Sequence, residues 1–179
     1  SPAQRLDPVS LNINHGEHIL ITGANGTGKS TLLAVLAGHL SPTGGTLEHA
    51  AELTYGMLSQ DSGWDQMADQ TARAVYEQTV GWHRAEAIPL STFGLLSAHD
   101  ENRPIGSLSV GQQRRLDLAI LLANPPEVLL LDEPTNHLSL VLVTQLEASI
   151  SQYPGTVLIA SHDRWLRDRW QGTRLHLPG

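Results

Sequence analysis

Two kinds of hydrophobic pattern alternate along the chain. Short apolar runs, such as residues 18–22 (HILIT) and 128–131 (VLLL), are typical of strands that are buried on both faces of a parallel sheet. Between the runs, apolar residues recur every three or four positions, as in residues 110–123, which is the period of a helix with one buried face. Strands and helices that take turns predict an α/β fold with a mainly parallel sheet flanked by helices.

Glycine and proline residues mark the ends of the predicted elements. Gly38 ends a helix that begins at Lys29, and Pro125 and Pro126 follow the helix at residues 110–123. Two further helices are expected at residues 140–152 and 163–170. We expect strands around Leu11 and Ile13 and at residues 18–22, 52–58, 128–131, 156–160 and 173–177.

The middle of the chain differs from the rest in composition. From Asp61 onward it is polar and alanine-rich, with helical segments at residues 69–80 and 84–98. We therefore expect one domain, with a core formed by residues 1–60 and 108–179 and a small helical subdomain at about residues 61–107. Because the chain starts at Ser1 without a methionine, we expect it to be a piece of a longer protein.

Composition and charge exclude several classes of protein. The 179 residues include no cysteine, which excludes a disulfide framework, a thiolate metal site and a thiol nucleophile. The net charge of −7, from 11 basic and 18 acidic residues, argues against a broad electrostatic grip on nucleic acid, although local contacts stay possible. No signal peptide and no apolar run of about 18 residues is present, so we expect a cytoplasmic protein without membrane insertion.

A glycine-rich turn lies between the strand at residues 18–22 and the next helix. It reads GANGTGKS and fits the pattern G-x-x-x-x-G-K-[ST], in which backbone N–H groups and a lysine surround phosphate oxygens. Lys29 is the only lysine of the chain, and a compact ammonium fits between phosphate oxygens where a guanidinium does not. Ser30 offers a hydroxyl to Mg²⁺. The candidate phosphate-binding residues are Gly23, Ala24, Asn25, Gly26, Thr27, Gly28, Lys29, Ser30 and Thr31.

Two carboxylates follow the strand at residues 128–131. Asp132 and Glu133 stand at its C-terminal end, where ligands of open α/β sheets bind. Asp132 is a candidate ligand of Mg²⁺, and Glu133, which points in another direction, can face an attacking water. Taken alone, such a pair is more often a solvated edge or a helix cap, but beside a phosphate-binding turn we expect a nucleotide phosphatase of the P-loop NTPase class.

A third segment, LSVGQ at residues 108–112, resembles the signature sequence of ATP-binding cassette (ABC) ATPases. Val110 stands where that family usually has glycine. The resemblance implies that Ser109, Gly111 and Gln112 contact the ATP that is bound to a second ABC domain. Without the resemblance, Ser109 and Gln112 have the spacing of a helix capping box, so both interpretations stay open.

Other residues occur in the order that this family has. Gln60 matches the glutamine that reaches Mg²⁺ and the water, and His162 matches the histidine that touches the γ-phosphate. Residues 136–139 (NHLS) follow Pro134 and Thr135 where the family has its D-loop; Ser139 replaces the common aspartate there but can still cap the next helix. The family's aromatic residue that stacks on adenine precedes the phosphate-binding turn, but nothing aromatic precedes Tyr55 here, so either that residue lies upstream of Ser1 or other residues hold adenine. By resemblance, Glu133, His162 and Gln60 are catalytic, Ser30, Gln60 and Asp132 hold Mg²⁺, and ATP is the substrate.

The segments EPTNHL at residues 133–138 and SHDR at residues 161–164 are most similar to the ABC-F branch. Proteins of that branch carry two such domains and act on ribosomes as translation or antibiotic-resistance factors. The resemblance therefore implies the second domain of an ABC-F protein, with another ABC domain and the ribosome as partners. The first alternative is the ATPase subunit of a membrane transporter with a permease as partner, and the second is a nucleotide-sensing module without turnover.

Overall fold

The computed structural model describes residues 8–49, 53–58 and 63–178. The chain divides into two compact units. The sheet unit consists of Ser1–Met57, Pro126–Thr135 and Val143–Gly179, and the helical unit consists of Leu58–Pro125 and Asn136–Leu142.

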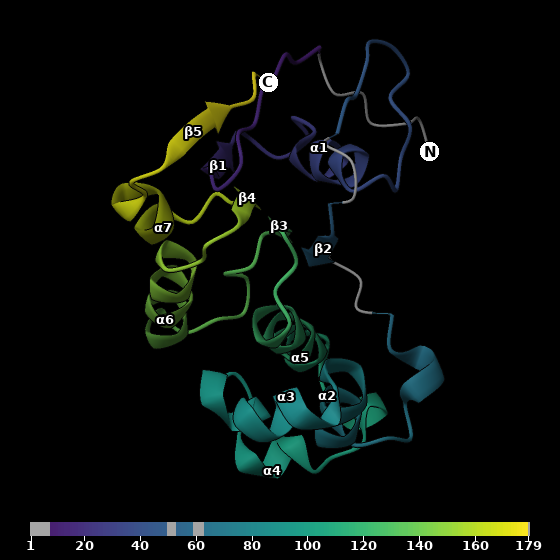
Figure 1. Ribbon diagram of the computed structural model, residues 1–179. Coiled ribbons are helices and arrows are strands. Elements are labelled where there is room, and N and C mark those ends of the chain that lie inside the picture. Colours follow the sequence, from purple (N-terminus) through teal and green to yellow (C-terminus); the bar gives the residue numbers. More distant parts are fainter. Residues whose placement is uncertain (1–7, 50–52, 59–62, 179) are drawn as a thin grey trace. The chain divides into compact units, whose positions relative to one another are not determined.

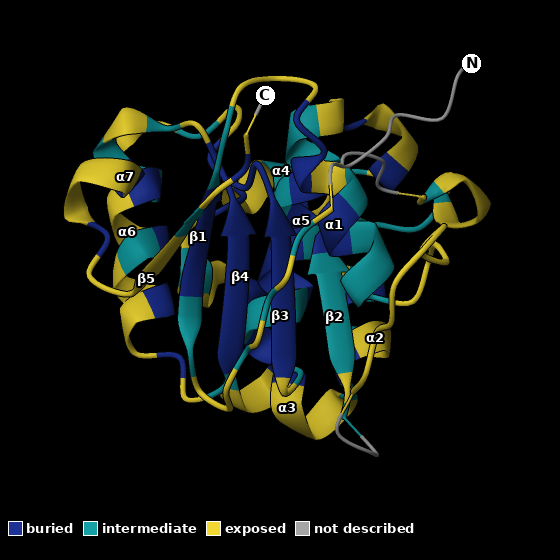
Figure 2. Ribbon diagram, turned by 90° about the horizontal axis from the view of Figure 1, so that it is seen from above, coloured by how far each residue is buried: buried dark blue, intermediate teal, exposed yellow. Residues whose placement is uncertain are grey.

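Five strands form one sheet in the order β2-β3-β4-β1-β5. Their bounds are β1 His18–Thr22, β2 Tyr55–Leu58, β3 Val128–Asp132, β4 Thr156–Ala160 and β5 Thr173–His176. The pairings of β1 with β4, β1 with β5 and β3 with β4 are all parallel, and Leu158 of β4 lies between Ile19 of β1 and Leu130 of β3. Strands β3 and β4 are buried along their whole length (Figure 2), as their continuous apolar sequences predict.

Helices cover both faces of this sheet (Figure 1). Helix α1 (Lys29–Leu36) lies on one face, where Leu32 and Leu33 belong to a core cluster with alternate residues of the strands. The C-terminal part of α6 (Leu140–Ser151) and α7 (Arg164–Arg169) lie on the other face. Because side chains alternate across a strand, Ile19 and Ile21 join the α1 cluster while Leu20 points to the opposite face.

The helical unit is built of short elements. They are η1 Asp65–Met67, α2 Ala72–Val80, α3 Trp82–Ala87, η2 Leu90–Phe93, α4 Ala98–Glu101, η3 Ile105–Ser107 and α5 Val110–Ala123. Helix α2 packs against α3, α4 and α5, and its Tyr76 is buried and donates a hydrogen bond of 2.5 Å to the carbonyl of Ile88. Burial raises the pKa of the Tyr76 hydroxyl, which keeps that hydroxyl a donor.

The predicted fold class is confirmed, and most predicted elements agree to within two residues with the structure. The strand expected around Leu11 and Ile13 was wrong, because residues 8–17 contain no strand. The helix expected at residues 84–98 is divided into α3, η2 and the start of α4, since Pro89 cannot donate a backbone hydrogen bond inside a helix. No helix of the described segments is long and apolar enough to span a bilayer.

Candidate functional site

The turn between β1 and α1 requires glycine at its first position. The backbone of Gly23 has a φ of +150°, and a Cβ there would lie 2.7 Å from Oγ1 of Thr27 and 3.0 Å from the carbonyl oxygen of Leu177. Gly28 has a left-handed conformation (φ 97°) at the N-cap of α1, where no side chain caps the helix. The backbone therefore turns tightly and leaves the first N–H groups of α1 available to an anion.

Lys29 is buried at the start of α1, with 7% of its surface exposed. Its Nζ donates hydrogen bonds to the carbonyl oxygens of Gly23 at 2.5 Å and Ala24 at 3.2 Å. The hydroxyl of Thr27 donates to the same Ala24 carbonyl at 2.8 Å. The turn thus folds around the ammonium, and it holds a positive charge at the helix end where the backbone dipoles also favour an anion.

The other loop residues are accessible. Ala24, Asn25 and Gly26 form an exposed apex, and Ser30 is exposed on the first turn of α1. The hydroxyl of Ser30 and the carboxylate of Asp132 are hard oxygen donors, which is the donor type that Mg²⁺ prefers. The residues present therefore fit a magnesium nucleotide. Gln60, the third predicted magnesium ligand, lies outside the described residues.

Asp132 and Glu133 are both buried at the end of β3. Asp132 pairs in register with Ala160 of β4, and the N–H of Glu133 donates a 2.8 Å hydrogen bond to the carbonyl of Ala160. Glu133 has a φ of 48°, which is the left-handed region that residues with a side chain rarely adopt. Such a conformation costs about 1–3 kcal/mol and is retained mainly at functional sites. The chain bends at Glu133, directly after β3 ends at Asp132.

His162 lies next to Glu133. Its Nδ1 is 2.8 Å from Oε1 of Glu133, and its side chain is otherwise exposed. Backbone bonds place it: the N–H of Ser161 donates to the carbonyl of Ile21 on β1, and Asp163 caps α7 by accepting from the N–H of Leu166. The structure thus brings together two residues that are 29 positions apart in sequence.

These residues share one edge of the sheet. Because β1, β3 and β4 are parallel, their C-terminal ends point to the same side (Figure 2), and each end is followed by one predicted site segment. The segments are the turn from Gly23 to Lys29 after β1, Asp132 and Glu133 at β3, and His162 after β4. The carboxyl edge of a parallel sheet is where ligands bind in open α/β folds.

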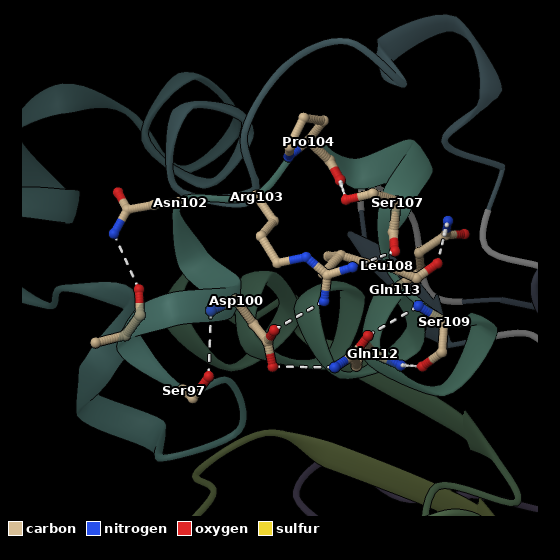
Figure 3. Close-up of polar contacts among 11 residues, drawn as sticks. Ser97, Asp100, Asn102, Arg103, Pro104, Ser107, Leu108, Ser109, Gln112 and Gln113 are labelled. Carbon is tan, nitrogen blue, oxygen red and sulfur yellow. Dashed lines mark hydrogen bonds and ion pairs between the residues drawn. The ribbon is translucent and has the colours of Figure 1, made fainter.

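The signature-like segment is fixed by polar contacts within the helical unit (Figure 3). Ser109 caps α5: its Oγ accepts from the N–H of Gln112 at 3.1 Å, and its own N–H donates to Oε1 of Gln112 at 2.8 Å. Nε2 of Gln112 donates to Asp100, and Asp100 also pairs with Arg103 at 3.0 Å. The capping box is therefore present, while the hydroxyl proton of Ser109 can still be donated to an anion.

The residues that support this segment were not predicted from the sequence. Asp100 lies in helix α4 and Arg103 follows that helix, in a stretch whose polar composition predicted nothing specific, and the Arg103 pair lowers the pKa of Asp100. His137 has a φ of 65°, and a Cβ on Gly111 would lie 3.3 Å from its side chain. Arg115 donates to the His137 carbonyl at 3.4 Å. The predicted cap is confirmed, because Oγ of Ser139 accepts from the N–H of Leu142 at 3.3 Å.

Comparisons with known proteins agree with this geometry. A family profile described as "ABC transporter" matches residues 6–136. The "Tylosin resistance ATP-binding protein TlrC" of Streptomyces fradiae is 37% identical over 186 residues, covering 99% of this chain and 34% of that protein. The "Energy-dependent translational throttle protein EttA" of Haemophilus influenzae is 35% identical over 174 residues, covering 92% of this chain and 30% of that protein. The chain thus spans about a third of the length of these relatives.

A solved structure is similar as well. It is titled "Dimeric structure of a post-hydrolysis state of the ATP-binding cassette MJ0796 bound to ADP and Pi". Its TM-score is 0.70 at 26% identity, and the likeness covers 88% of this chain and 80% of that one. The similarity therefore extends over both compact units of the chain.

The signature helix α5 contains a carboxylate with a shifted pKa. Burial raises the pKa of Asp117 to about 6, against the opposing effect of Arg114. The folded state therefore binds more protons than the unfolded state between about pH 4 and pH 6, and stability falls as the pH rises through that window. Above the window the charged carboxylate stays desolvated and destabilises the fold.

We expect Asp117→Asn to raise the free energy of unfolding at pH 7 by about 1–2 kcal/mol and to weaken the fall in stability between pH 4 and 6. Urea titrations at several pH values measure both effects. Asp65→Asn, on an exposed residue of the same unit, is the matched control. A parallel pH profile for wild type and Asp117→Asn would contradict the assignment.

Proposed function

Because this chain belongs to the ABC transporter family and is an ATPase domain of that family, we propose that it binds ATP with Mg²⁺ at the turn between β1 and α1 and hydrolyses it. The observation that carries the proposal is the buried Lys29 ammonium inside a glycine turn at the N-terminus of α1. This is the arrangement that places backbone N–H groups and one full charge around a phosphate chain. Adenine as the base rests on the family alone.

In the proposed reaction, the residues 23–31 hold the phosphates of ATP and Lys29 exchanges its carbonyl contacts for phosphate oxygens. Magnesium would be held by Ser30, Asp132 and Gln60 and would neutralise charge on the phosphates. Glu133 orients the attacking water and accepts its proton. The contact with Glu133 positions His162, which contacts the γ-phosphate of the bound ATP. Gln60 contacts the same phosphate group.

We also propose that hydrolysis needs a second ABC domain. In this proposal Ser109, Gly111 and Gln112 contact the ATP bound to the partner domain, and the partner's equivalent segment completes the site of this chain. Two features support it: the capping box and the Asp100 contact hold the segment in one conformation, and a similar solved cassette is dimeric. ATP binding closes the pair and hydrolysis opens it, so the nucleotide shifts a conformational population. The isolated chain should therefore turn over slowly.

The cellular role we propose is that of an ABC-F protein in the cytoplasm that acts on the ribosome. The support comes from the names of similar proteins, one a translational throttle protein and one a tylosin resistance protein. Domain closure driven by ATP would then change how the longer protein engages the ribosome. In the alternative role, as the ATPase subunit of a transporter, the same closure would act on a permease.

Lys29→Met is expected to weaken ATP binding at least ten-fold, because it removes the charge-assisted contacts to the phosphates and keeps the side-chain volume. Isothermal calorimetry with ATP and Mg²⁺ measures the affinity. Arg84→Gln, which removes a positive charge from the helical unit, is the control and should bind as wild type does. An unchanged affinity of the Lys29 variant, with normal circular dichroism, would rule out the phosphate-binding turn.

Glu133→Gln is expected to keep ATP affinity and to lower steady-state hydrolysis by about 100-fold or more, because the amide cannot accept the proton of water. Phosphate release by the longer protein is the measurement, with Glu127→Gln just before β3 as the control. With ATP, the Glu133→Gln protein should sediment with ribosomes rather than with membranes. If the Glu133→Gln protein released phosphate at the wild-type rate, Glu133 would be excluded as the base. Sedimentation of this variant with membranes would favour the transporter role.

A further inference from the structure

Exposed arginines of the sheet unit gather in one place. Four of the ten arginines of the chain lie between residues 164 and 174, and all four are exposed. Within the described part of the sheet unit, Lys29 is the remaining lysine or arginine, and it is buried in the turn after β1. The cluster, called the α7–β5 surface below, consists of Arg164, Arg167, Arg169 and Arg174.

Residues 163–174 carry the four arginines and two aspartates, Asp163 and Asp168, which is a local net charge of +2. None of the four forms an ion pair with a carboxylate of the described residues, and the nearby Asp163 instead caps α7. In the helical unit, by contrast, Arg73 pairs with Glu101 at 2.8 Å and Arg103 pairs with Asp100. The α7–β5 surface is thus locally positive in a chain whose net charge is −7, and its guanidinium groups are not held by carboxylates of the described residues.

Two of the four arginines are held in fixed orientations. Nη2 of Arg174 donates to the carbonyls of Arg167 at 2.6 Å and Trp170 at 3.0 Å, which ties strand β5 to the end of α7. The guanidinium carbon of Arg169 lies 3.0 Å from the centre of the Trp165 ring. Side chains that are already ordered lose less entropy when they bind a ligand. Strand β5 stands at the end of the sheet, so its outer side adjoins no other described strand.

We propose that the α7–β5 surface is a docking site for the phosphate backbone of RNA. Guanidinium forks match phosphate geometry, and planar guanidinium and indole groups accept stacked bases. A lipid surface is disfavoured, because the large apolar side chains that are exposed in the described residues all lie outside residues 164–176. The proposal rests on the proposed function in one respect: the RNA that binds this surface would be RNA of the ribosome, which is the proposed partner.

The test uses the 179-residue chain without nucleotide, fluorescently labelled RNA and anisotropy at several salt concentrations. The probes are a 20-nucleotide single strand and a hairpin duplex. We expect dissociation constants of about 10⁻⁴–10⁻⁶ M at physiological salt, tighter binding at low salt and a negative slope of log affinity against log salt. Arg164→Gln/Arg167→Gln should weaken binding about ten-fold or more and reduce the magnitude of the slope by about one to two.

Two further variants separate charge from structure. Arg164→Lys/Arg167→Lys keeps both charges and should retain most of the binding, whereas Arg84→Gln removes a charge from the other unit and should bind as wild type does. Equal RNA affinity of wild type and the double glutamine variant would overturn the proposal, as would binding to phosphatidylserine vesicles without binding to RNA. ATP affinity, measured in the same samples, tests the proposed function separately, because the four arginines lie outside the phosphate-binding turn.

Discussion

A buried ammonium inside a glycine turn is the constraint on which the site depends. Lys29 lies below the surface at the start of α1, and the carbonyls of Gly23 and Ala24 surround it. Only a residue without a Cβ fits at Gly23, since Thr27 and Leu177 lie too close. The turn therefore requires glycine at its first position, and β1 and α1 flank it on either side. Charge, helix dipole and backbone N–H groups then favour the same kind of ligand, an anion with several oxygens.

Parallel strands extend that constraint to the rest of the site. The pairing of β4 with β1 and β3 puts the ends of three strands side by side, so residues far apart in sequence become neighbours. Glu133 meets His162 in this way, and the residue that makes this contact has a left-handed backbone conformation. The surrounding buried strands stabilise the fold enough to hold Glu133 in this strained conformation. The signature segment is organised separately, by the contacts of Ser109, Gln112 and Asp100 within the helical unit.

The fold could be predicted largely from the sequence, because buried parallel strands such as β3 and β4 are continuous apolar runs that few other structures require. The weak alternation at Leu11 and Ile13 was misleading, since two apolar residues among polar ones carry little packing information. The glycine turn and the carboxylates after β3 were visible as motifs. The contact between Glu133 and His162, the strain at Glu133 and the support from Asp100 and Arg103 are tertiary features, and no local pattern encodes them.

The central claim is that the turn between β1 and α1 receives the phosphates of ATP. Hydrogen exchange measured by mass spectrometry, with and without ATP and Mg²⁺, tests it most directly. The account predicts that ATP slows amide exchange in peptides that cover residues 23–31 and slows it less at the C-terminal ends of β3 and β4. It predicts no change in α3, which carries the exposed Trp82. Unchanged exchange in residues 23–31 at saturating ATP would contradict the account.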